Sequence, residues 1–309
     1  MDNNNLLVIV GPTSIGKSQF AIDIAQKHSG EIINGDSRQI YKLLNIGTSK
    51  PNKTDQSIIK HHLIDIKYPD EEYNLSMFLH DCKKSIKKIQ TSSKLPILVG
   101  GSGQYIWALL ENWKPPNIKP DQKLRSQLLQ ESIEYGTKYL HNKLFKLNTA
   151  SANKIDQRNT RRIIRAIEIE IYKDLTNRTP DIPNNNIINI EKFNILIIGL
   201  TVNRKTLYEK IDLRVDKMIE SGWIDETKNI LSKGYNPKIA SLSSLGYSEI
   251  ISYLNGVGDL PEAINQTKFR THKFARRQYT WFKKSDKRIK WFDTETELIY
   301  AKEYINKWI

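Results

Sequence analysis

The stretch Gly11-Pro12-Thr13-Ser14-Ile15-Gly16-Lys17-Ser18 fits the phosphate-loop pattern G-x-x-x-x-G-K-[ST] at every fixed position. The run Leu6-Leu7-Val8-Ile9-Val10 before it is short and apolar, as expected of a strand buried in a parallel sheet. Residues 20–25 after it favour a helix. This order of strand, glycine loop and helix predicts an α/β core.

The residues of this loop are suited to holding phosphate. Glycines allow the backbone to bend so that successive N–H groups point at one anion. The following helix adds the positive end of its dipole. Lys17 adds a full charge, and the Ser18 hydroxyl can ligate Mg²⁺. We therefore expect residues 11–18 to bind a diphosphate or triphosphate, whose identity the loop leaves open.

The composition indicates a globular protein with a polyanionic partner. Its 309 residues suffice for one large domain or two smaller ones, and 39% of them are hydrophobic. The net charge of +14 favours nucleic acid as the partner, with a lysine-rich surface as the alternative.

Cysteine usage and hydropathy point to a cytoplasmic protein without a membrane segment. Cys82 is the single cysteine, so a disulfide within the chain is excluded. A reducing compartment is therefore the simplest expectation for its location. The amino terminus lacks the basic start of a signal peptide, and no apolar run is long enough to span a membrane.

A second candidate for the site is Asp36. Residues 31–36 are expected to form a strand ending at this carboxylate. Ligands of open α/β sheets bind at the carboxyl ends of strands, which puts Asp36 beside the phosphate loop. It could hold Mg²⁺, accept a proton or cap a helix.

Another strand, residues 96–99, is followed directly by glycines rather than by an acid. Phosphate-loop NTPases often place an acid there to hold Mg²⁺. The sequence Gly100-Gly101-Ser102-Gly103 instead permits close approach of the backbone to a ligand, and it weakens the interpretation as an ordinary NTPase.

Residues 113–183 are predicted to be helical and to interrupt the α/β core as an inserted domain. Four arginines there, Arg158, Arg161, Arg162 and Arg165, have the spacing of one helix face, and Ile163, Ile164, Ile167 and Ile171 have that of the opposite face. An RNA backbone contact and a solvated face are the two interpretations of the arginines. Residues 193–200 then resume the core as a buried strand, and residues 207–231 are predicted to form a helix that carries Arg214.

Most of the net charge lies in residues 268–290, with ten Lys or Arg against one Asp. Arg270, Lys273, Phe274, Arg277 and Trp281 share one stripe of the helix predicted there. Basic residues interleaved with aromatic ones suit single-stranded or looped nucleic acid, because charges contact phosphates and rings contact bases. The alternative is a solvated cationic helix with its aromatic rings packed inward.

Taken together, these motifs resemble the bacterial tRNA dimethylallyltransferases, also called tRNA isopentenyltransferases, over residues 7–293. The blocks that carry the resemblance are the phosphate loop, Asp36-Ser37-Arg38-Gln39-Ile40-Tyr41, Ile46-Gly47-Thr48-Ser49-Lys50-Pro51, His61-His62-Leu63-Ile64-Asp65, Gly100-Gly101-Ser102-Gly103, the arginines at 161–165, Gly246-Tyr247 and Arg277-Gln278-Tyr279-Thr280-Trp281.

The resemblance implies a phosphate-loop NTPase-like α/β core, with a parallel sheet flanked by helices, in residues 1–112 and 191–309. It implies an inserted all-helical tRNA-binding domain in residues 113–190. The implied reaction transfers a dimethylallyl group from dimethylallyl diphosphate to N6 of adenosine 37 in the anticodon stem-loop of tRNA and releases diphosphate, with Mg²⁺ as cofactor. The target base would be flipped out to reach the site. We expect a cytoplasmic monomer.

The resemblance also implies roles for individual residues. Asp36 would be the general base, while Thr13, Lys17, Ser18 and Arg214 would bind and stabilise the leaving diphosphate. The other positions that match diphosphate-binding residues are Gly11, Pro12, Ser14, Ile15 and Gly16, and Ser18 would ligate the metal. The positions that match tRNA-contacting stretches are Asp36, Ser37, Arg38, Gln39, Ser102, Arg161, Arg162, Arg165, Gly246, Tyr247, Arg276, Arg277, Gln278, Thr280 and Trp281.

Four positions depart from the family pattern. Ser102 stands where Thr is usual, Gln104 where Leu is usual, and Lys210 and His272 where Arg is common. Two alternative functions stay open. One is a kinase or isopentenyltransferase that acts on a free nucleotide, and the other is a non-catalytic RNA-binding protein.

Overall fold

We analysed a computed structural model of the chain, which describes residues 4–116, 118–176 and 188–309. None of its helices is long and apolar enough to cross a bilayer over these residues. The elements follow one another as β1 (Asn5–Val10), α1 (Lys17–Lys27), β2 (Gly30–Asn34), α2 (Lys53–Ile58), β3 (His61–His62), α3 (Leu75–Thr91), β4 (Leu95–Val99), α4 (Gly103–Leu110), α5 (Gln122–Tyr135), α6 (Thr137–Leu147), α7 (Thr149–Asn153), α8 (Thr160–Thr176), a short 3-10 helix (Ile190–Lys192), β5 (Asn194–Thr201), α9 (Arg204–Glu220), α10 (Trp223–Ser232), α11 (Tyr247–Leu254), α12 (Leu260–Trp281), β6 (Ile289–Asp293) and α13 (Leu298–Trp308).

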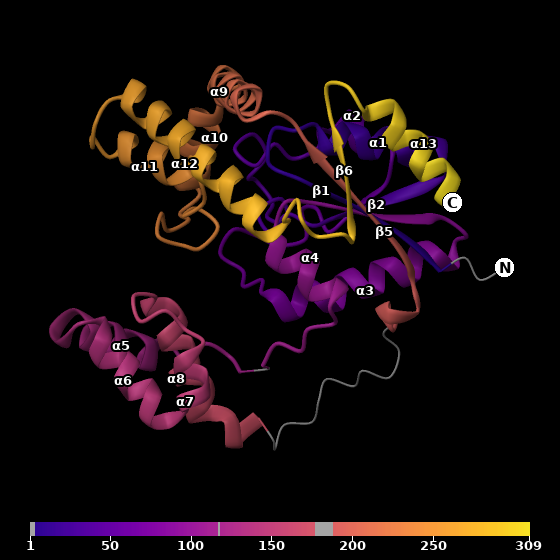
Figure 1. The fold of residues 1–309 in the computed structure, drawn as a ribbon. Helices are drawn as coiled ribbons and strands as arrows, with labels where there is room; N and C mark the ends of the chain where they lie inside the picture. Colours follow the sequence, from indigo (N-terminus) through magenta and orange to yellow (C-terminus); the bar gives the residue numbers. More distant parts are fainter. Residues whose placement is uncertain (1–3, 117, 177–187) are drawn as a thin grey trace. The chain divides into compact units, whose positions relative to one another are not determined.

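The core is one parallel sheet with the strand order β3-β2-β4-β1-β5-β6 (Figure 1). Strand β1 lies between β4 and β5, and its Val8 pairs with Leu98 on one side and Ile197 on the other. All six residues of β1 are buried, as expected of a strand covered on both faces. The predicted α/β fold, a parallel sheet flanked by helices, is confirmed.

Alternate side chains of β1 enter different layers of the core, because successive residues of a strand point to opposite faces. Leu6, Val8 and Val10 pack in the cluster that contains buried residues of α3 and α4. Leu7 and Ile9 pack in the cluster that contains α1 and α13, and these helices lie on the other face of the sheet (Figure 1). Each such aliphatic side chain contributes about 1.5–3 kcal/mol by its burial.

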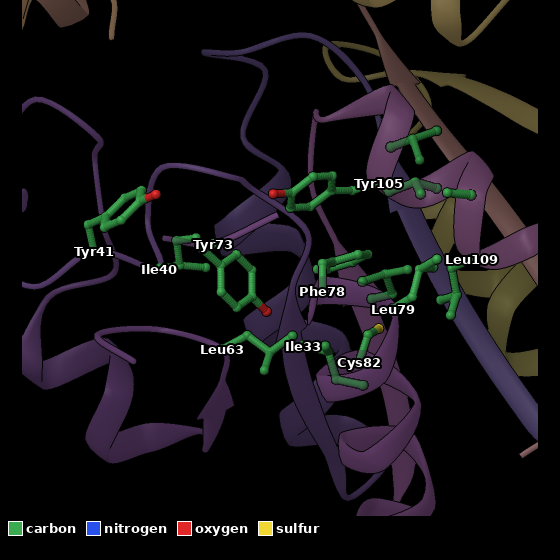
Figure 2. Close-up of a cluster of buried hydrophobic side chains, with 14 of the residues drawn as sticks. Ile33, Ile40, Tyr41, Leu63, Tyr73, Phe78, Leu79, Cys82, Tyr105 and Leu109 are labelled. Atoms are coloured by element: carbon green, nitrogen blue, oxygen red, sulfur yellow. The ribbon is translucent and has the colours of Figure 1, made fainter. Parts of the chain in front are cut away.

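Figure 2 shows part of the first cluster, where side chains from β2, α3 and α4 meet. Phe78 and Tyr105 stack with ring centroids 4.3 Å apart. Cys82 is fully buried beside them, and this burial raises the pKa of its thiol far above the ordinary value. The single cysteine is therefore an inert packing residue rather than a reactive group.

The chain divides into two compact units, residues 1–113 with 187–309, and residues 114–186. The second unit has its own apolar core, which includes Leu128, Leu140, Ile163 and Ile167. Helices α5 to α8 account for its regular structure within residues 118–176, while residues 177–183 of the predicted helical stretch lie outside the described residues. Its role in binding tRNA stays a prediction.

Two side chains of the predicted faces in this unit lie elsewhere. Arg158 precedes the first residue of α8 and pairs with Asp156 at 2.8 Å, so it is not part of the helical arginine face. Ile171 is 44% exposed, unlike Ile163 and Ile167, and it is not part of the apolar core of this unit.

Three predicted element boundaries were wrong. The helix expected over 207–231 is two helices, because Gly222 adopts a left-handed conformation (φ 92°) and starts α10. The basic helix expected over 268–290 ends at Trp281, so four of its Lys and Arg residues lie in the following turn. Strand β2 ends at Asn34, whose side chain accepts from the Asp36 backbone N–H and donates to the Asp36 carbonyl oxygen, and these bonds turn the chain there.

Candidate active site

The phosphate loop joins β1 to α1 with the backbone geometry that its glycines permit. Gly16 precedes α1 in a left-handed conformation (φ 90°), which a side chain would disfavour. Gly11 (φ 145°) lies against β5, where an added Cβ would come within 2.4 Å of the Leu200 carbonyl oxygen. The predicted strand–loop–helix context is thus present around residues 11–18.

Two cationic side chains converge on this loop. Lys17 donates from Nζ to the Pro12 carbonyl oxygen at 2.6 Å. Arg214, on α9, donates from Nη1 to Oγ1 of Thr13 at 2.8 Å and from Nε to Oγ of Ser49 at 2.8 Å. Thr13 and Arg214, which are 201 positions apart in the sequence, are thereby brought together beside the carboxyl end of β1.

The pKa values at this place reflect two enclosed positive charges. Burial, and then the neighbouring Arg214, lower the pKa of Lys17 to about 7, while Asp36 opposes that shift. Burial also lowers the pKa of Arg214, and Asp36 again opposes it. The single carboxylate leaves an excess of positive charge, which an anion bound at the loop would neutralise.

Asp36 is held in a fixed orientation after β2. Its backbone N–H donates to the Asn34 side chain at 2.9 Å, and its Oδ1 accepts from the Arg38 backbone N–H at 2.8 Å. Its other oxygen, Oδ2, has no hydrogen-bond partner among the described residues. Asp36 therefore offers one free carboxylate oxygen to a ligand.

Two cavities meet at these residues. The smaller, of about 100 Å³, contains Lys17 and Ser18 in its wall. The larger, of about 340 Å³, extends toward α12 and contains Arg277. Both are lined by Thr13, Asp36, Thr48, Arg214 and Phe274. A ligand in the smaller cavity and another in the larger one would thus come together beside Asp36 and Arg214.

The loop at residues 45–49, which carries the Arg214 partner Ser49, is anchored by Glu226 of α10. The Glu226 carboxylate accepts hydrogen bonds from the backbone N–H groups of Asn45, Ile46 and Gly47 and from the Tyr247 hydroxyl. Sequence reasoning missed Glu226, because nothing in the residues around it indicates a partner 180 positions away. Ser49 lies within a block that carries the family resemblance, without a predicted role of its own.

Several predicted tRNA residues lie around the larger cavity or on the surface. Ser37, Arg38, Ser102 and Arg277 line that cavity. Arg276, Arg277, Thr280 and Trp281 are exposed on α12, and Arg161 and Arg162 are exposed on α8. These side chains are accessible to a macromolecular ligand.

Other predicted tRNA residues make contacts inside the protein. Tyr247 and Gly246 pack against Trp223, and the Tyr247 hydroxyl bonds Glu226. The Gln39 amide donates to the backbone carbonyl oxygens at 48 and 49. Arg165 pairs with Glu168, whose side chain is fully buried. A sequence motif does not distinguish such supporting residues from surface contacts.

Gln278 has the most informative of these internal contacts. It is 3% exposed, and its Oε1 accepts from the Thr13 backbone N–H at 2.8 Å while its Nε2 donates to the Gly101 carbonyl oxygen at 3.1 Å. One amide of α12 therefore connects the phosphate loop to the glycine loop after β4.

The four departures from the family pattern have defined surroundings. The Ser102 hydroxyl accepts from the Ser37 backbone N–H at 3.2 Å, and Gln104 is exposed on α4. Lys210 approaches Glu295 at 3.8 Å. His272 pairs with Asp212 at 2.8 Å and stacks on Tyr208. None of these positions adds a charge to the cavity of the phosphate loop.

The residues present fit a magnesium ion that arrives with a phosphate ligand. The described residues contain no group of three or more His, Cys, Asp or Glu side chains that could hold a metal alone. Ser18 is exposed in the first turn of α1 and lines the same cavity as Lys17 and Asp36. Mg²⁺ is commonly bound through few protein ligands together with substrate phosphates.

Comparison with known sequences gives a consistent family. A family model described as IPP transferase matches residues 39–285. A protein of Pelotomaculum thermopropionicum named tRNA dimethylallyltransferase is 42% identical over 296 residues, which are 94% of this chain and 91% of that one. A protein of the same name from Acetivibrio thermocellus is 40% identical over 308 residues, 97% of each chain.

Solved structures agree with the sequences. The tRNA isopentenylpyrophosphate transferase of Bacillus halodurans is 34% identical, covers 99% of this chain with 96% of its own, and superposes with a TM-score of 0.71. A eukaryotic dimethylallyltransferase, described as acting on tRNA, is 27% identical with a TM-score of 0.77, over 97% of this chain and 77% of its own. The family match over most of the chain and the near full-length relatives lead to one conclusion: this chain belongs to the IPP transferase family.

Proposed function

We propose that this protein transfers the dimethylallyl group of dimethylallyl diphosphate to N6 of the adenosine at position 37 of tRNA, next to the anticodon, and releases diphosphate. The observation that carries the proposal is the pair of partly buried cations Lys17 and Arg214, which face a single carboxylate, Asp36, at the junction of two cavities. The names of the relatives support this assignment over a free nucleotide as acceptor.

In this proposal the donor diphosphate occupies the cavity of the phosphate loop. Lys17, the Thr13 hydroxyl and Arg214 bind its oxygens. These groups already lie in place before the reaction, so they stabilise the charge that develops when the bond between C1 and the diphosphate oxygen breaks. Ser18 would hold Mg²⁺, which would supply further neutralisation of the charge on the leaving group.

The acceptor adenine enters from the larger cavity, flipped out of the RNA. Its N6 attacks C1 of the dimethylallyl group from the side opposite the diphosphate. The new C–N bond forms as the C–O bond breaks, and the surplus proton on N6 passes to the free oxygen of Asp36. The exposed Arg277 and the Arg38 side chain, both in the wall of this cavity, lie where they can contact the neighbouring phosphates.

The test supplies labelled dimethylallyl diphosphate together with an unmodified tRNA, with AMP or with ATP. The proposal predicts label on tRNA at the adenosine after the anticodon, and none on the free nucleotides. Transfer to AMP or ATP without transfer to tRNA would favour the free-nucleotide alternative. Binding of tRNA without any transfer would favour a non-catalytic RNA-binding protein.

Localisation in the cytoplasm and a monomeric state belong to the same proposal. Size-exclusion chromatography with light scattering tests the monomeric state.

A further inference from the structure

A separate cavity of about 330 Å³ lies where β5 leads into α9, on the side of α12 that faces away from the reaction cavity. Its wall contains three cations, Arg204, Arg276 and Lys284, and two tyrosines, Tyr208 and Tyr279. No carboxylate lines it. Sequence reasoning assigned a role to Arg276 alone among these residues.

The arginines converge on one oxygen. Arg204 donates from Nε to the Tyr208 hydroxyl at 3.0 Å, and Arg276 donates from Nη1 to the same hydroxyl at 3.0 Å. Burial alone would raise the pKa of Tyr208, but these two hydrogen bonds outweigh it and lower the pKa below its ordinary value. The hydroxyl proton of Tyr208 remains available, so the cluster presents several donors to one ligand.

The three cations have no counter-charge of their own. Within the described residues, Arg204, Arg276 and Lys284 form no ion pair with a carboxylate. Asp212, one turn after Tyr208 on α9, lies 2.8 Å from His272 and forms no ion pair with these three cations. Like charges held this close repel one another unless an anion lies between them. The composition of the cavity therefore selects a negatively charged ligand.

The aromatic rings indicate which part of a nucleic acid fits. Tyr208 is covered on its ring faces by His272, stacked at 4.1 Å between centroids, and by the Arg204 guanidinium, 5.3 Å from the ring centroid. Lys284 lies over the Tyr279 ring at 5.7 Å. These faces are already used, so they are poor stacking platforms for a base. The guanidinium and ammonium groups are left for phosphate oxygens.

We propose that this cavity, defined by Arg204, Tyr208, Arg276 and Lys284, binds a phosphate of the tRNA backbone while the target adenine occupies the reaction cavity. The proposal rests on the function proposed above. Arg270, Phe274 and Arg277 line the reaction cavity from one side of α12, and Arg276 and Tyr279 lie on the opposite side of the helix. A helix is about 10–12 Å across with its side chains, so one RNA bound across α12 can contact both sides.

The test compares Arg204→Gln and Lys284→Gln with Lys205→Gln, which removes the same charge from an exposed neighbour outside the cavity. Equilibrium binding of an unmodified tRNA is measured over a salt series without donor. Each cavity variant should weaken binding and reduce the log–log salt slope by about 0.7–0.9, the value for one lost phosphate contact. Lys205→Gln should leave affinity and slope at wild-type values. Arg204→Lys should keep most of the slope, because it retains the charge. Thermal unfolding verifies that each variant is folded, and Lys284→Gln removes an exposed side chain.

A second experiment titrates inorganic diphosphate into the wild type and the same variants, since a free anion could fill the same cavity. Weaker diphosphate binding by Arg204→Gln and Lys284→Gln, with an unchanged tRNA salt slope, would overturn the proposal in favour of a free anion. Equal slopes for the cavity variants and Lys205→Gln would overturn it outright. Dimethylallyl transfer by the wild type is measured on the same tRNA. If the wild type transfers the group normally but the salt slopes of the cavity variants equal that of Lys205→Gln, only the phosphate site is refuted. If the cavity variants have smaller slopes than Lys205→Gln but the wild type transfers nothing, only the proposed function is refuted.

Discussion

Gln278 of α12 accepts a hydrogen bond from the backbone N–H of Thr13, in the phosphate loop, at 2.8 Å. The same amide donates to Gly101, so a helix that carries exposed basic residues is fastened directly to the diphosphate site. Gly101 permits this contact, because an added Cβ would lie 2.0 Å from the Gln278 amide nitrogen. A change in the position of α12 would therefore be transmitted to the phosphate loop through this amide.

Gln278→Leu is expected to lower the free energy of unfolding and to raise the KM for the prenyl donor. The change leaves a loop N–H and a carbonyl oxygen without their partner, at a cost of about 1–3 kcal/mol for each buried group left unsatisfied. Gln278→Glu retains an acceptor for Thr13 and should lose less. Urea denaturation and donor KM measure the two effects. A loss of tRNA affinity with unchanged stability and donor KM would instead make Gln278 an RNA contact.

Arg165 and Arg161 should respond differently to truncation, although both lie on α8. Arg165 pairs with Glu168, which is fully buried and also accepts from Arg125. Burial would raise the pKa of Glu168, but the hydrogen bonds from Arg125 and Arg165 lower it below its ordinary value. Arg165→Ala removes a charge-assisted hydrogen bond of about 1.5–3 kcal/mol and should destabilise the unit at residues 114–186.

Arg161→Ala is the matched control on the same helix, because Arg161 is exposed. It should leave thermal stability unchanged and weaken tRNA binding, with a smaller salt slope. Unfolding curves and a salt series of tRNA affinity separate the two variants. Equal loss of tRNA affinity in both, without any loss of stability in Arg165→Ala, would contradict the assignment of Arg165 as a supporting residue.

Arg277 and Trp281 are expected to contribute to RNA binding by different physical means. Arg277 is exposed and lines the reaction cavity, so Arg277→Ala should reduce the salt slope of tRNA binding by about 0.7–0.9. Trp281 is 37% exposed, and its side chain packs on Gly103. Trp281→Ala should cost about 1–3 kcal/mol of binding if a base stacks there, with the salt slope unchanged.

A stability measurement decides between stacking and packing for Trp281. Truncation of a core Trp costs about 3–5 kcal/mol, and the part of the indole that lies against Gly103 should contribute less than that. A large loss of stability with unaltered tRNA affinity would place Trp281 in the core alone. If Arg277→Ala changes neither the tRNA affinity nor its salt slope, this side of α12 is a solvated surface that does not contact RNA.

Sequence reasoning predicted the parts of the fold whose signals are local. The phosphate loop, the apolar run of β1 and the helix after the loop are each encoded within a few neighbouring residues, and they formed as expected. The break at Gly222 was missed, because glycine within a helical pattern is only a weak signal. The stripe from Arg270 to Trp281 did form a helix, but the run of basic residues continues beyond it and gave no signal for the end of the helix at Trp281.

The sequence predicted which side chains supply the chemistry of the site. It did not predict which residues hold those side chains in place. Lys17 and Asp36 could be placed from motifs, since the carboxyl ends of all strands in a parallel sheet lie at the same edge. The bonds from Arg214 to Thr13, from Glu226 to residues 45–47 and from Gln278 to Gly101 join segments more than 165 positions apart. No local pattern encodes such contacts, so residues with a supporting role could not be separated from those exposed to RNA.

The central claim is that Asp36 takes the proton of the acceptor at the junction of the two cavities. Its most direct test is single-turnover transfer by Asp36→Asn, with tRNA and dimethylallyl diphosphate both saturating and their dissociation constants measured separately. Asn keeps the size of the side chain and an oxygen for the Arg38 N–H, but it cannot accept a proton. We predict a rate about 10²–10⁴-fold below wild type, as for loss of a general base, with both dissociation constants nearly unchanged. A rate that equals the wild-type rate once tRNA saturates the enzyme would make Asp36 a binding residue and would contradict the account.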